Sequence, residues 1–309
     1  MSLFHRVRKA VNELLAPSGI AIDRTEKRSW KWLNRTATTR VGQYFIEVPG
    51  ISPMASHYTR HPNWSSQLGR LTSIIRKKYP AMAAIDVGAN VGDTACIIKS
   101  AEDIPLLCIE GDEFTFGFLQ KNIAQFKNTT THQFFLGEKA GVISVDKEKA
   151  GWNLTLIPGT TASASNIELT TLDDFLASRP ERASFKLLKI DTEGFDCSII
   201  RGAMNYIRSA SPVITFEYNR GNMDAIGEPG LPTLFTLQAA GYSGVAFHDQ
   251  AGRFLLSAKL EDRPLIKDLH DYADCVQGRI GYLDITVFHA NDTDLAETFV
   301  ELERSRRSS

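Results

Sequence analysis

Three things are missing from this sequence: a long hydrophobic run, an excess of one sign of charge, and paired cysteines. No run approaches the roughly 18 consecutive apolar residues that a helix needs to cross a bilayer. The 35 Lys and Arg residues nearly balance the 36 Asp and Glu residues, which leaves a formal net charge of −1. Proteins that grip a nucleic-acid backbone usually show clustered basic charge. We therefore expect neither a transmembrane segment nor a nucleic-acid substrate.

The sequence has four cysteines, Cys96, Cys108, Cys197 and Cys275, and none of them forms a CxxC pair. Cys96 and Cys108 lie among apolar residues, which is typical of buried thiols in a reducing compartment rather than of a disulfide framework or a zinc site. The charged residues 1–9 are not followed by the apolar core and cleavage site of a secretion signal. The sequence therefore predicts a cytoplasmic protein.

The 309 residues, 43% hydrophobic and 23% charged, have the composition of a globular protein with one or two domains. No linker rich in proline or glycine divides the chain, but the pattern changes near residue 80. Residues 3–15 show a basic amphipathic pattern, which fits a helix docked on its own protein better than one lying on a membrane. We expect residues 1–80 to form an accessory segment and residues 81–309 to form one α/β domain.

After residue 80, short apolar runs alternate with helical patterns, as in a doubly wound α/β fold. The apolar runs predict strands over residues 83–87, 105–110, 132–136, 185–190, 213–218, 245–248, 253–256 and 282–288. The helical patterns cover residues 93–100, 113–126, 169–176, 195–209 and 233–240. Within the third of these, Thr171 is placed to cap the first helical turn. Apolar strands of this kind favour a mostly parallel sheet, and a turn pattern over residues 249–252 indicates an antiparallel end.

A glycine-containing turn follows the first predicted strand, where α/β sheets bind ligands. Gly88 and Gly92 allow a tight turn and close approach of a ligand, and Asn90 tolerates a positive φ. Asp86 is the last but one residue of the strand before this turn. The turn is not G-x-G-x-x-G and lacks the Lys-Ser/Thr of a P-loop, so a turn without a ligand is the alternative.

The second and third predicted strands add further candidates. Glu110 ends the second strand eighteen residues beyond Gly92, near the position where a carboxylate holds a ribose diol. The alternative for Glu110 is a solvated strand end. The third strand ends at Phe135 and Leu136, which are suited either to packing on an aromatic base or to the core.

Carboxylates also follow the fourth and fifth predicted strands. Asp191 and Glu193 emerge two residues apart after the fourth strand, and Glu217 lies near the end of the fifth. Together with Glu110, they are expected to converge on one edge of the sheet. Their mutual repulsion must be offset by a cationic ligand, a metal or a shared proton. For Asp191 and Glu193 the alternative is a role as helix caps.

Taken together, these motifs resemble the FkbM-type family of S-adenosylmethionine-dependent methyltransferases. The motifs are Ile-Asp-Val-Gly-Ala-Asn-Val-Gly-Asp-Thr at 85–94, Ile-Glu-Gly-Asp at 109–112, Thr-Leu-Asp-Asp-Phe-Leu at 171–176, Leu-Lys-Ile-Asp-Thr-Glu-Gly-Phe at 188–195, Ile-Ile-Arg-Gly-Ala at 199–203 and Pro-Val-Ile-Thr-Phe-Glu at 212–217. The likeness extends over about residues 81–290 and does not cover residues 1–80. Gly111 stands where the family usually has a proline after the acidic residue, which changes the turn that follows Glu110.

The resemblance implies a class I methyltransferase sheet, Rossmann-like and mostly parallel with an antiparallel last strand, and S-adenosylmethionine as the cofactor. The residues expected to bind the cofactor are Asp86, Gly88, Asn90, Gly92, Glu110, Gly111, Asp112, Leu136 and Asp191. Among them, Glu110 would bind the ribose hydroxyls, Asp112 would lie on the adenine side, and Asp191 would lie near the amino group and the sulfonium. Residues 81–309 would then be the methyltransferase domain, with residues 1–80 capping the acceptor.

The expected acceptor is a hydroxyl group of a sugar, glycan or polyketide-like small molecule. A neutral hydroxyl needs a base or a metal to take its proton. Glu193 is the first candidate base and Glu217 the second, while His57 or His61 of the accessory segment is a further candidate because of its near-neutral pKa. A divalent metal held through Asp191 and Glu217 is the alternative.

Three other functions are weighed against this one. An NAD-dependent Rossmann-type oxidoreductase or epimerase is disfavoured by the glycine pattern and because no tyrosine stands four residues before a lysine. The second alternative is a methyltransferase of nucleic acids or amines. Methyltransferases that act on exocyclic amines resemble one another in an Asn/Asp-Pro-Pro-aromatic motif, whereas residues 191–194 read Asp-Thr-Glu-Gly, which favours a hydroxyl acceptor. A methyltransferase-like module that only binds a partner is disfavoured by the set of crevice acids.

Overall fold

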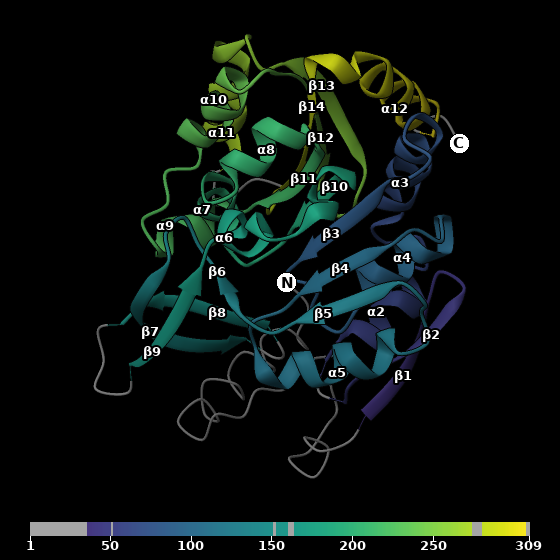
Figure 1. The fold of residues 1–309 in the computed structure, drawn as a ribbon, viewed down its shortest axis with the longest axis vertical. Coiled ribbons are helices and arrows are strands. Elements are labelled where there is room, and N and C mark those ends of the chain that lie inside the picture. Colours follow the sequence, from purple (N-terminus) through teal and green to yellow (C-terminus); the bar gives the residue numbers. More distant parts are fainter. Residues whose placement is uncertain (1–35, 51, 151–152, 160–163, 274–279, 307–309) are drawn as a thin grey trace, which may run out of the picture.

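The structure is a computed structural model that describes residues 36–50, 52–150, 153–159, 164–273 and 280–306 (Figure 1). The helix expected over residues 3–15 and the residue Cys275 lie outside these ranges. The other three cysteines are buried and free. Within the described ranges, no helix is both long enough and apolar enough to cross a membrane.

An eight-stranded sheet in the order β13-β12-β14-β11-β10-β3-β4-β5 forms the centre of the molecule (Figure 1). Its strands are β3 (Ala83–Val87), β4 (Leu106–Ile109), β5 (Thr129–His132), β10 (Phe185–Ile190), β11 (Val213–Tyr218), β12 (Tyr242–Asp249), β13 (Phe254–Lys259) and β14 (Leu283–His289). The strands from β11 to β5 are parallel. β14 is antiparallel to both β11 and β12, and β13 is antiparallel to β12. The predicted parallel sheet with an antiparallel end is therefore confirmed.

Helices cover both faces of this sheet, and each face has its own hydrophobic cluster. One cluster includes residues of α3 (Ser66–Lys78), α4 (Asp93–Ala101), α5 (Glu113–Ile123) and α12 (Thr293–Ser305). The other includes residues of α6 (Leu172–Ala177), α7 (Asp196–Arg201), α8 (Met204–Ala210), α9 (Arg220–Ala225), α10 (Leu231–Ala239) and α11 (Arg263–Ala273). Apolar strands such as β3 are buried from end to end because they contact helices on both sides.

The described part of the accessory segment packs on the first of these faces. It consists of the hairpin β1 (Thr36–Val41) and β2 (Tyr44–Pro49), followed by α2 (Met54–Arg60) and α3. Asn122 of α5 fixes the hairpin, because its amide donates to the Glu47 carbonyl at 2.8 Å and accepts from the Glu47 N–H at 2.8 Å. Residues of the hairpin, α2 and α3 belong to the same hydrophobic cluster as α4 and α5.

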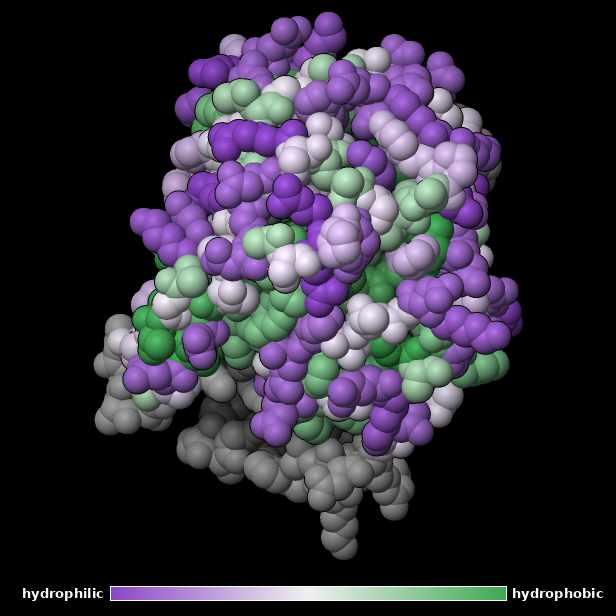
Figure 2. All heavy atoms as spheres, viewed as in Figure 1, coloured by the Kyte–Doolittle hydropathy of each residue, from purple (hydrophilic) through white to green (hydrophobic). Residues whose placement is uncertain are grey.

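A second, four-stranded sheet was not expected from the sequence. It has the order β6-β9-β7-β8, with β6 (Phe135–Leu136), β7 (Gly141–Ala150), β8 (Asn153–Pro158) and β9 (Ser165–Thr170). Hydrophilic residues dominate the face shown in Figure 2, and hydrophobic residues gather at its lower left, where Figure 1 places β7 and β9. The second sheet lies beside the pocket described below and contributes residues to its wall.

Several predicted elements are wrong in their boundaries. The strand expected over residues 132–136 is split between β5 of the central sheet and β6 of the second sheet. β5 is polar because it is an edge strand with one neighbour, so its threonines are not enclosed. The helix expected over residues 195–209 is broken into α7 and α8 at Gly202, where a Cβ would lie 2.2 Å from the Gly137 carbonyl oxygen. Residues 169–170 belong to β9, and the Thr171 cap of α6 is confirmed by the Asp174 N–H, which donates to its hydroxyl at 2.9 Å.

Candidate functional site

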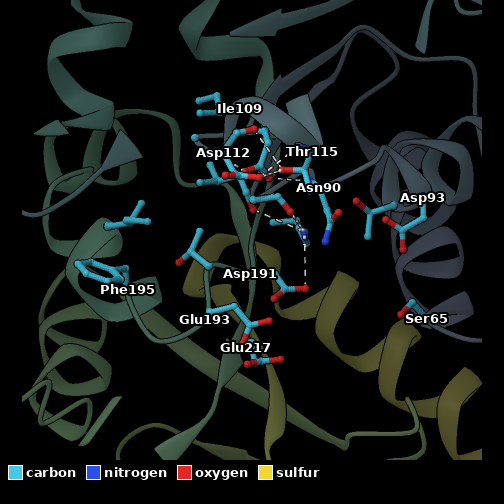
Figure 3. Close-up of a pocket in the computed structure, with 18 of the residues that line it drawn as sticks. Ser65, Asn90, Asp93, Ile109, Asp112, Thr115, Asp191, Glu193, Phe195 and Glu217 are labelled. Atoms are coloured by element: carbon cyan, nitrogen blue, oxygen red, sulfur yellow. Dashed lines mark hydrogen bonds and ion pairs between the residues drawn. The ribbon is translucent and has the colours of Figure 1, made fainter. Parts of the chain in front are cut away.

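A cavity of about 460 Å³ lies beyond the carboxyl ends of β3, β4, β10 and β11 (Figure 3). From β3 the chain continues to β4 and β5 on one side, whereas β10 and β11 lie on the other side. The order of strands therefore reverses between β3 and β10, and α/β sheets bind ligands at such a reversal. The predicted site residues that line this cavity are His57, Gly88, Asn90, Glu110, Gly111, Asp112, Leu136, Asp191, Glu193 and Glu217.

Two predicted residues lie behind the cavity wall. Asp86 is fully buried in β3 and accepts a hydrogen bond from the Thr94 hydroxyl. Gly92 precedes α4 with a φ of 89°, and a Cβ there would lie 3.1 Å from Leu119 and 3.2 Å from Ile123. In this structure Gly92 therefore serves the packing of α4 against α5.

The turn after β3 is tied to the neighbouring strands on both sides. The N–H groups of Gly88 and Ala89 both donate to the Ile109 carbonyl at the end of β4, at 2.9 and 3.0 Å. Gly88 has a φ of 68°, and a Cβ there would lie 1.8 Å from the Asp191 carbonyl oxygen after β10. Only glycine fits this position, because any side chain would collide with the backbone.

Glu110 is held by two backbone amides at the end of β4. Its carboxylate accepts from the Asn90 N–H at 2.9 Å and from the Asp112 N–H at 2.8 Å. Burial raises the pKa of Glu110, while these two bonds act against the rise. A carboxylate has about four acceptor positions, so two remain for the hydroxyls of a ligand. Asp112 itself caps α5 by accepting from the Thr115 N–H at 3.2 Å, and it also lines the cavity.

One side of the cavity is an apolar wall. It is formed by Phe134, Phe135, Leu136, Leu156 and Leu169, of which all but Phe134 come from the second sheet. A Cβ at Gly111 would lie 2.2 Å from the Phe135 ring, so the glycine lets this ring pack against the end of β4. Flat apolar surfaces of this kind suit an aromatic base.

Four further carboxylates line the cavity: Asp191, Glu193, Glu217 and Asp284 (the first three are labelled in Figure 3). Glu217 and Asp284 are directly opposite each other on β11 and β14. Burial, reinforced by neighbouring acids, raises the pKa of Glu193 to about 7 and that of Asp284 to about 8, and it raises the pKa of Glu217 strongly.

Neutral amides orient two of these carboxylates. The Asn222 amide donates to Glu193 at 2.7 Å, and the Asn219 amide donates to Glu217 at 3.2 Å. Asn219 caps α9, so this short helix and the two acids hold one another in place. The arrangement keeps ionisable groups with near-neutral pKa values on a cavity wall, as general bases require.

The accessory segment also contributes residues to the wall of the cavity. His57 of α2 lines it and packs edge-on against Trp64, with ring centroids 4.1 Å apart. Burial lowers the pKa of His57, so its ring is neutral near pH 7. His61 packs against His57 but does not line the cavity. Tyr58 donates to Asp93 at 2.7 Å, and both residues also line the cavity.

Sequence reasoning missed Lys189, Asp284, Tyr58 and Asp93. A lysine inside an otherwise apolar strand is itself a signal, because burying an ammonium requires a partner. The position of Asp284 opposite Glu217 depends on the register of β11 and β14, which no local pattern reveals. Within the described ranges, no three His, Cys, Asp or Glu side chains are grouped to hold a metal ion, so Asp191 and Glu217 have no third ligand of this kind there.

Some solved structures are similar to this chain at low identity. A methyltransferase FkbM from Methylobacillus flagellatus KT has 16% identity and a TM-score of 0.40 over 67% of this chain and 44% of that one. A putative transferase from Pyrococcus horikoshii has 12% identity and a TM-score of 0.41 over 93% of this chain and 85% of that one. A putative caffeoyl-CoA O-methyltransferase from Staphylococcus aureus has 10% identity and a TM-score of 0.38 over 71% of this chain and 82% of that one. This chain thus spans less than half the length of the Methylobacillus protein.

The family comparison is more direct. No curated protein matches the chain. The model of the methyltransferase FkbM domain matches residues 86–244, which is slightly more than half of the sequence. The matched residues run from β3 into β12 and include the glycine turn, Glu110, the two acids that follow β10 and Glu217 of β11. The α/β sheet is mostly parallel, and its last strand, β14, is antiparallel to its neighbours. The chain belongs to the FkbM methyltransferase family.

Proposed function

We propose that this protein is an S-adenosylmethionine-dependent O-methyltransferase that acts on a hydroxyl group of a sugar, glycan or polyketide-like small molecule. Family membership supports methyl transfer. One observation supports the proposed cofactor and hydroxyl acceptor. A single cavity combines a carboxylate held by backbone amides, an apolar wall and a group of acids with raised pKa values.

The cavity residues fit S-adenosylmethionine. Glu110 would accept from the ribose hydroxyls with its remaining lone pairs, and the apolar wall would pack against the adenine. The cofactor is cationic, so Asp191, whose side chain is 45% exposed on the cavity side, would attract its amino group and sulfonium. When bound, this cofactor supplies an electrophilic methyl group.

The protein's own part in the reaction is alignment and proton removal. A cavity that holds donor and acceptor in line lowers the entropic cost of reaching the transition state. Glu193 would take the proton of the acceptor hydroxyl, since burial places its pKa at about 7, where a base is both available and effective. Glu217 is the second candidate, and the neutral His57 is the third.

The accessory segment would cap the acceptor. In the described part of this segment, the residues that line the cavity are Pro53, Met54, His57, Tyr58, Trp64 and Ser65. They belong to α2, to the residue before it and to the turn before α3. A cap of this kind would exclude water from the acceptor hydroxyl.

Calorimetry with S-adenosylmethionine, S-adenosylhomocysteine and NAD tests the cofactor. We expect both sulfur nucleosides to bind and NAD not to bind. Tight binding of NAD without binding of the sulfur nucleosides would instead support an NAD-dependent oxidoreductase or epimerase. Methyl transfer from labelled S-adenosylmethionine to a panel of hydroxylated acceptors separates an enzyme from a non-catalytic module, which would bind the nucleoside and transfer nothing to any acceptor.

A further inference from the structure

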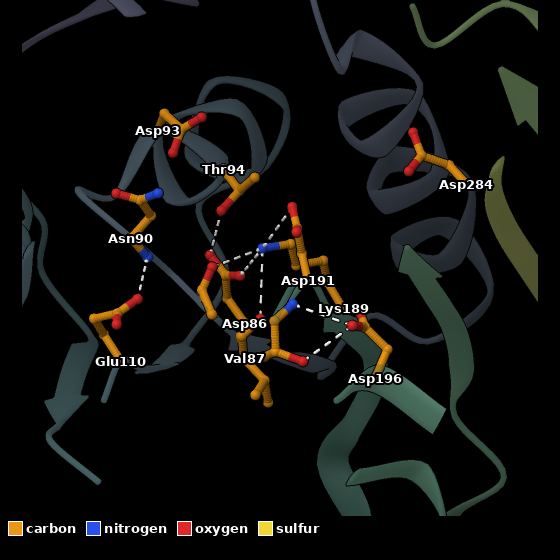
Figure 4. A network of polar contacts seen from close by, with 12 residues as sticks. Asp86, Val87, Asn90, Asp93, Thr94, Glu110, Lys189, Asp191, Asp196 and Asp284 are labelled. Carbon is orange, nitrogen blue, oxygen red and sulfur yellow. Dashed lines mark hydrogen bonds and ion pairs between the residues drawn. The ribbon is translucent and has the colours of Figure 1, made fainter. Parts of the chain in front are cut away.

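A buried ammonium lies at the wall of the cavity, at the point where the strand order reverses (Figure 4). It belongs to Lys189 of β10, which is 6% exposed. Its Nζ forms an ion pair with Asp86 Oδ1 at 3.0 Å and lies 3.8 Å from Asp191 Oδ2. Burial alone would lower the pKa of Lys189, but Asp86 and Asp191 raise it above its usual range, so the side chain stays charged.

The N–H groups of Lys189 are directed at protein atoms. Besides the contact with Asp86, the ammonium donates to the Gly88 carbonyl at 3.0 Å and to the Val87 carbonyl at 3.5 Å. An ammonium has three donors, and these three partners account for them. Lys189 is therefore placed to act through the backbone and the carboxylates around it rather than by bonding to a ligand.

The atoms that Lys189 contacts join the two strand ends that form the cavity floor. The Asp191 N–H donates to the Val87 carbonyl at 3.1 Å, and the Cα of Gly88 lies against the Asp191 carbonyl. Lys189 crosses from β10 to β3 beneath this junction. It thereby fixes the carbonyl side of the glycine turn and attracts the carboxylate of Asp191 at the same time.

The charge of Lys189 has little direct effect on a ligand. Asp86 lies 3.0 Å away and is fully buried, so the pair presents a small net field to the cavity. Ordering of the turn and of Asp191 is then the larger effect. This effect is confined to one end of the cavity, because Glu110 at the other end is held by its own two amides.

We propose that Lys189 is a positioning residue for the cofactor: it locks the Val87–Gly88 turn to Asp191 and so orders the end of the cavity that receives the amino-acid and sulfur part of the nucleoside. This inference rests on the proposed function. It predicts that Lys189 contributes to the affinity for S-adenosylhomocysteine, which has the amino-acid part. It also predicts that Lys189 does not contribute to the affinity for adenosine, which has only the part assigned to Glu110 and the apolar wall.

Calorimetry with the full-length protein and these two ligands tests the proposal. Lys189→Met is expected to raise the Kd for S-adenosylhomocysteine at least tenfold and to change the Kd for adenosine less than twofold. Since Lys189→Met leaves Asp86 buried without its cation, the double variant Asp86→Asn/Lys189→Met is measured as well. Its melting temperature should recover, and its affinity for S-adenosylhomocysteine should stay weak. Lys186→Met is the control, because Lys186 lies on the same strand and donates to the Ala210 carbonyl away from the cavity.

Two results would overturn the role of Lys189. One is a Kd for S-adenosylhomocysteine in the double variant that equals that of the unmodified protein. The other is an equal loss of affinity for adenosine and S-adenosylhomocysteine, which would mean that the lysine only maintains the fold. Failure of the unmodified protein to bind S-adenosylhomocysteine is a different result, because it would contradict the proposed function, and the proposal for Lys189 would fall with it.

Discussion

Two backbone amides give Glu110 an orientation that its side chain could not keep alone. The N–H groups of Asn90 and Asp112 point at separate oxygens of the carboxylate, from the glycine turn and from the start of α5. The acid at the end of β4 was predictable because it follows an apolar strand at a set distance from a glycine turn. Its two donors were not, since they depend on the positive φ of Asn90 and on the cap formed by Asp112.

Replacement of Glu110 tests this arrangement. Glu110→Gln puts an amide donor against one of the two N–H groups and removes the negative charge, so we expect the Kd for S-adenosylmethionine to rise at least tenfold. A lost hydrogen bond to a charged group costs about 1.5–3 kcal/mol, which agrees with that factor. Titration calorimetry measures it, with Glu113→Gln on the exposed first turn of α5 as the control. Equal affinities of all three proteins would remove Glu110 from the cofactor site.

Glu193 is expected to give the reaction its pH dependence. Burial raises the pKa of Glu193 to about 7, and a base works in its deprotonated form, so kcat should rise with pH through about 7 and then level off. Glu193→Gln should lower kcat about 100-fold or more and abolish this rise, with the affinity for S-adenosylhomocysteine unchanged. Steady-state rates between pH 5.5 and 9 measure both effects, with the exposed Glu181→Gln as the control. A variant with normal kcat would move the base to Glu217 or His57.

At the scale of elements, apolar periodicity predicted the strands that are enclosed on both faces and failed for the polar edge strand β5 and for the second sheet. β3 and β10 are buried along most of their length, and their residue ranges agree with the expected ones. The edge strand β5 is a run of threonines, and the second sheet consists of strands whose polar residues alternate with apolar ones. The sequence was therefore informative about the centre of the sheet and silent about the sheet that supplies part of the apolar wall.

The break between α7 and α8 shows how one close approach overrides a helical pattern. Gly202→Ala would place a Cβ 2.2 Å from the Gly137 carbonyl oxygen, which is backbone and has little freedom to move. We expect the free energy of unfolding to fall by about 1–3 kcal/mol, as in other overpacked sites. Gly117→Ala in α5 is the matched control, because a Cβ there has no neighbour within 4 Å, and it should stabilise the protein by about 0.5–1 kcal/mol. Urea unfolding measures both, and equal stabilities would contradict the proposed cause of the break.

At the scale of the whole molecule, a nearly neutral chain concentrates carboxylates with raised pKa values around one cavity. Burial and neighbouring charges raise the pKa of Asp196 and Glu193 to about 7 and that of Asp284 to about 8. In the unfolded chain these groups titrate near pH 4. Between about pH 4 and 8 these groups therefore hold more protons in the folded protein than in the unfolded chain, and their contribution to stability falls as the pH rises.

Thermal unfolding checks this pH dependence. The stabilising contribution of these acids is present in full below about pH 4 and is lost as the pH rises through 7 to 8, so the melting temperature should be higher at pH 6 than at pH 8.5. Asp284→Asn, which cannot ionise, should reduce the difference. Glu303 acts in the opposite sense, since its ion pairs lower its pKa to about 2, but that contribution is lost only below about pH 4. A melting temperature that rises from pH 6 to pH 8.5 would show that the cavity acids are not buried as described.

The most direct measurement is a crystal structure of the protein with S-adenosylhomocysteine. It should show the ribose hydroxyls on the Glu110 carboxylate, the adenine against Leu136 and its neighbouring aromatic rings, and the sulfur facing Asp191, with Lys189 still bonded to Gly88. A nucleoside bound outside this cavity, or a cavity filled by the protein's own side chains in the presence of saturating ligand, would contradict the account.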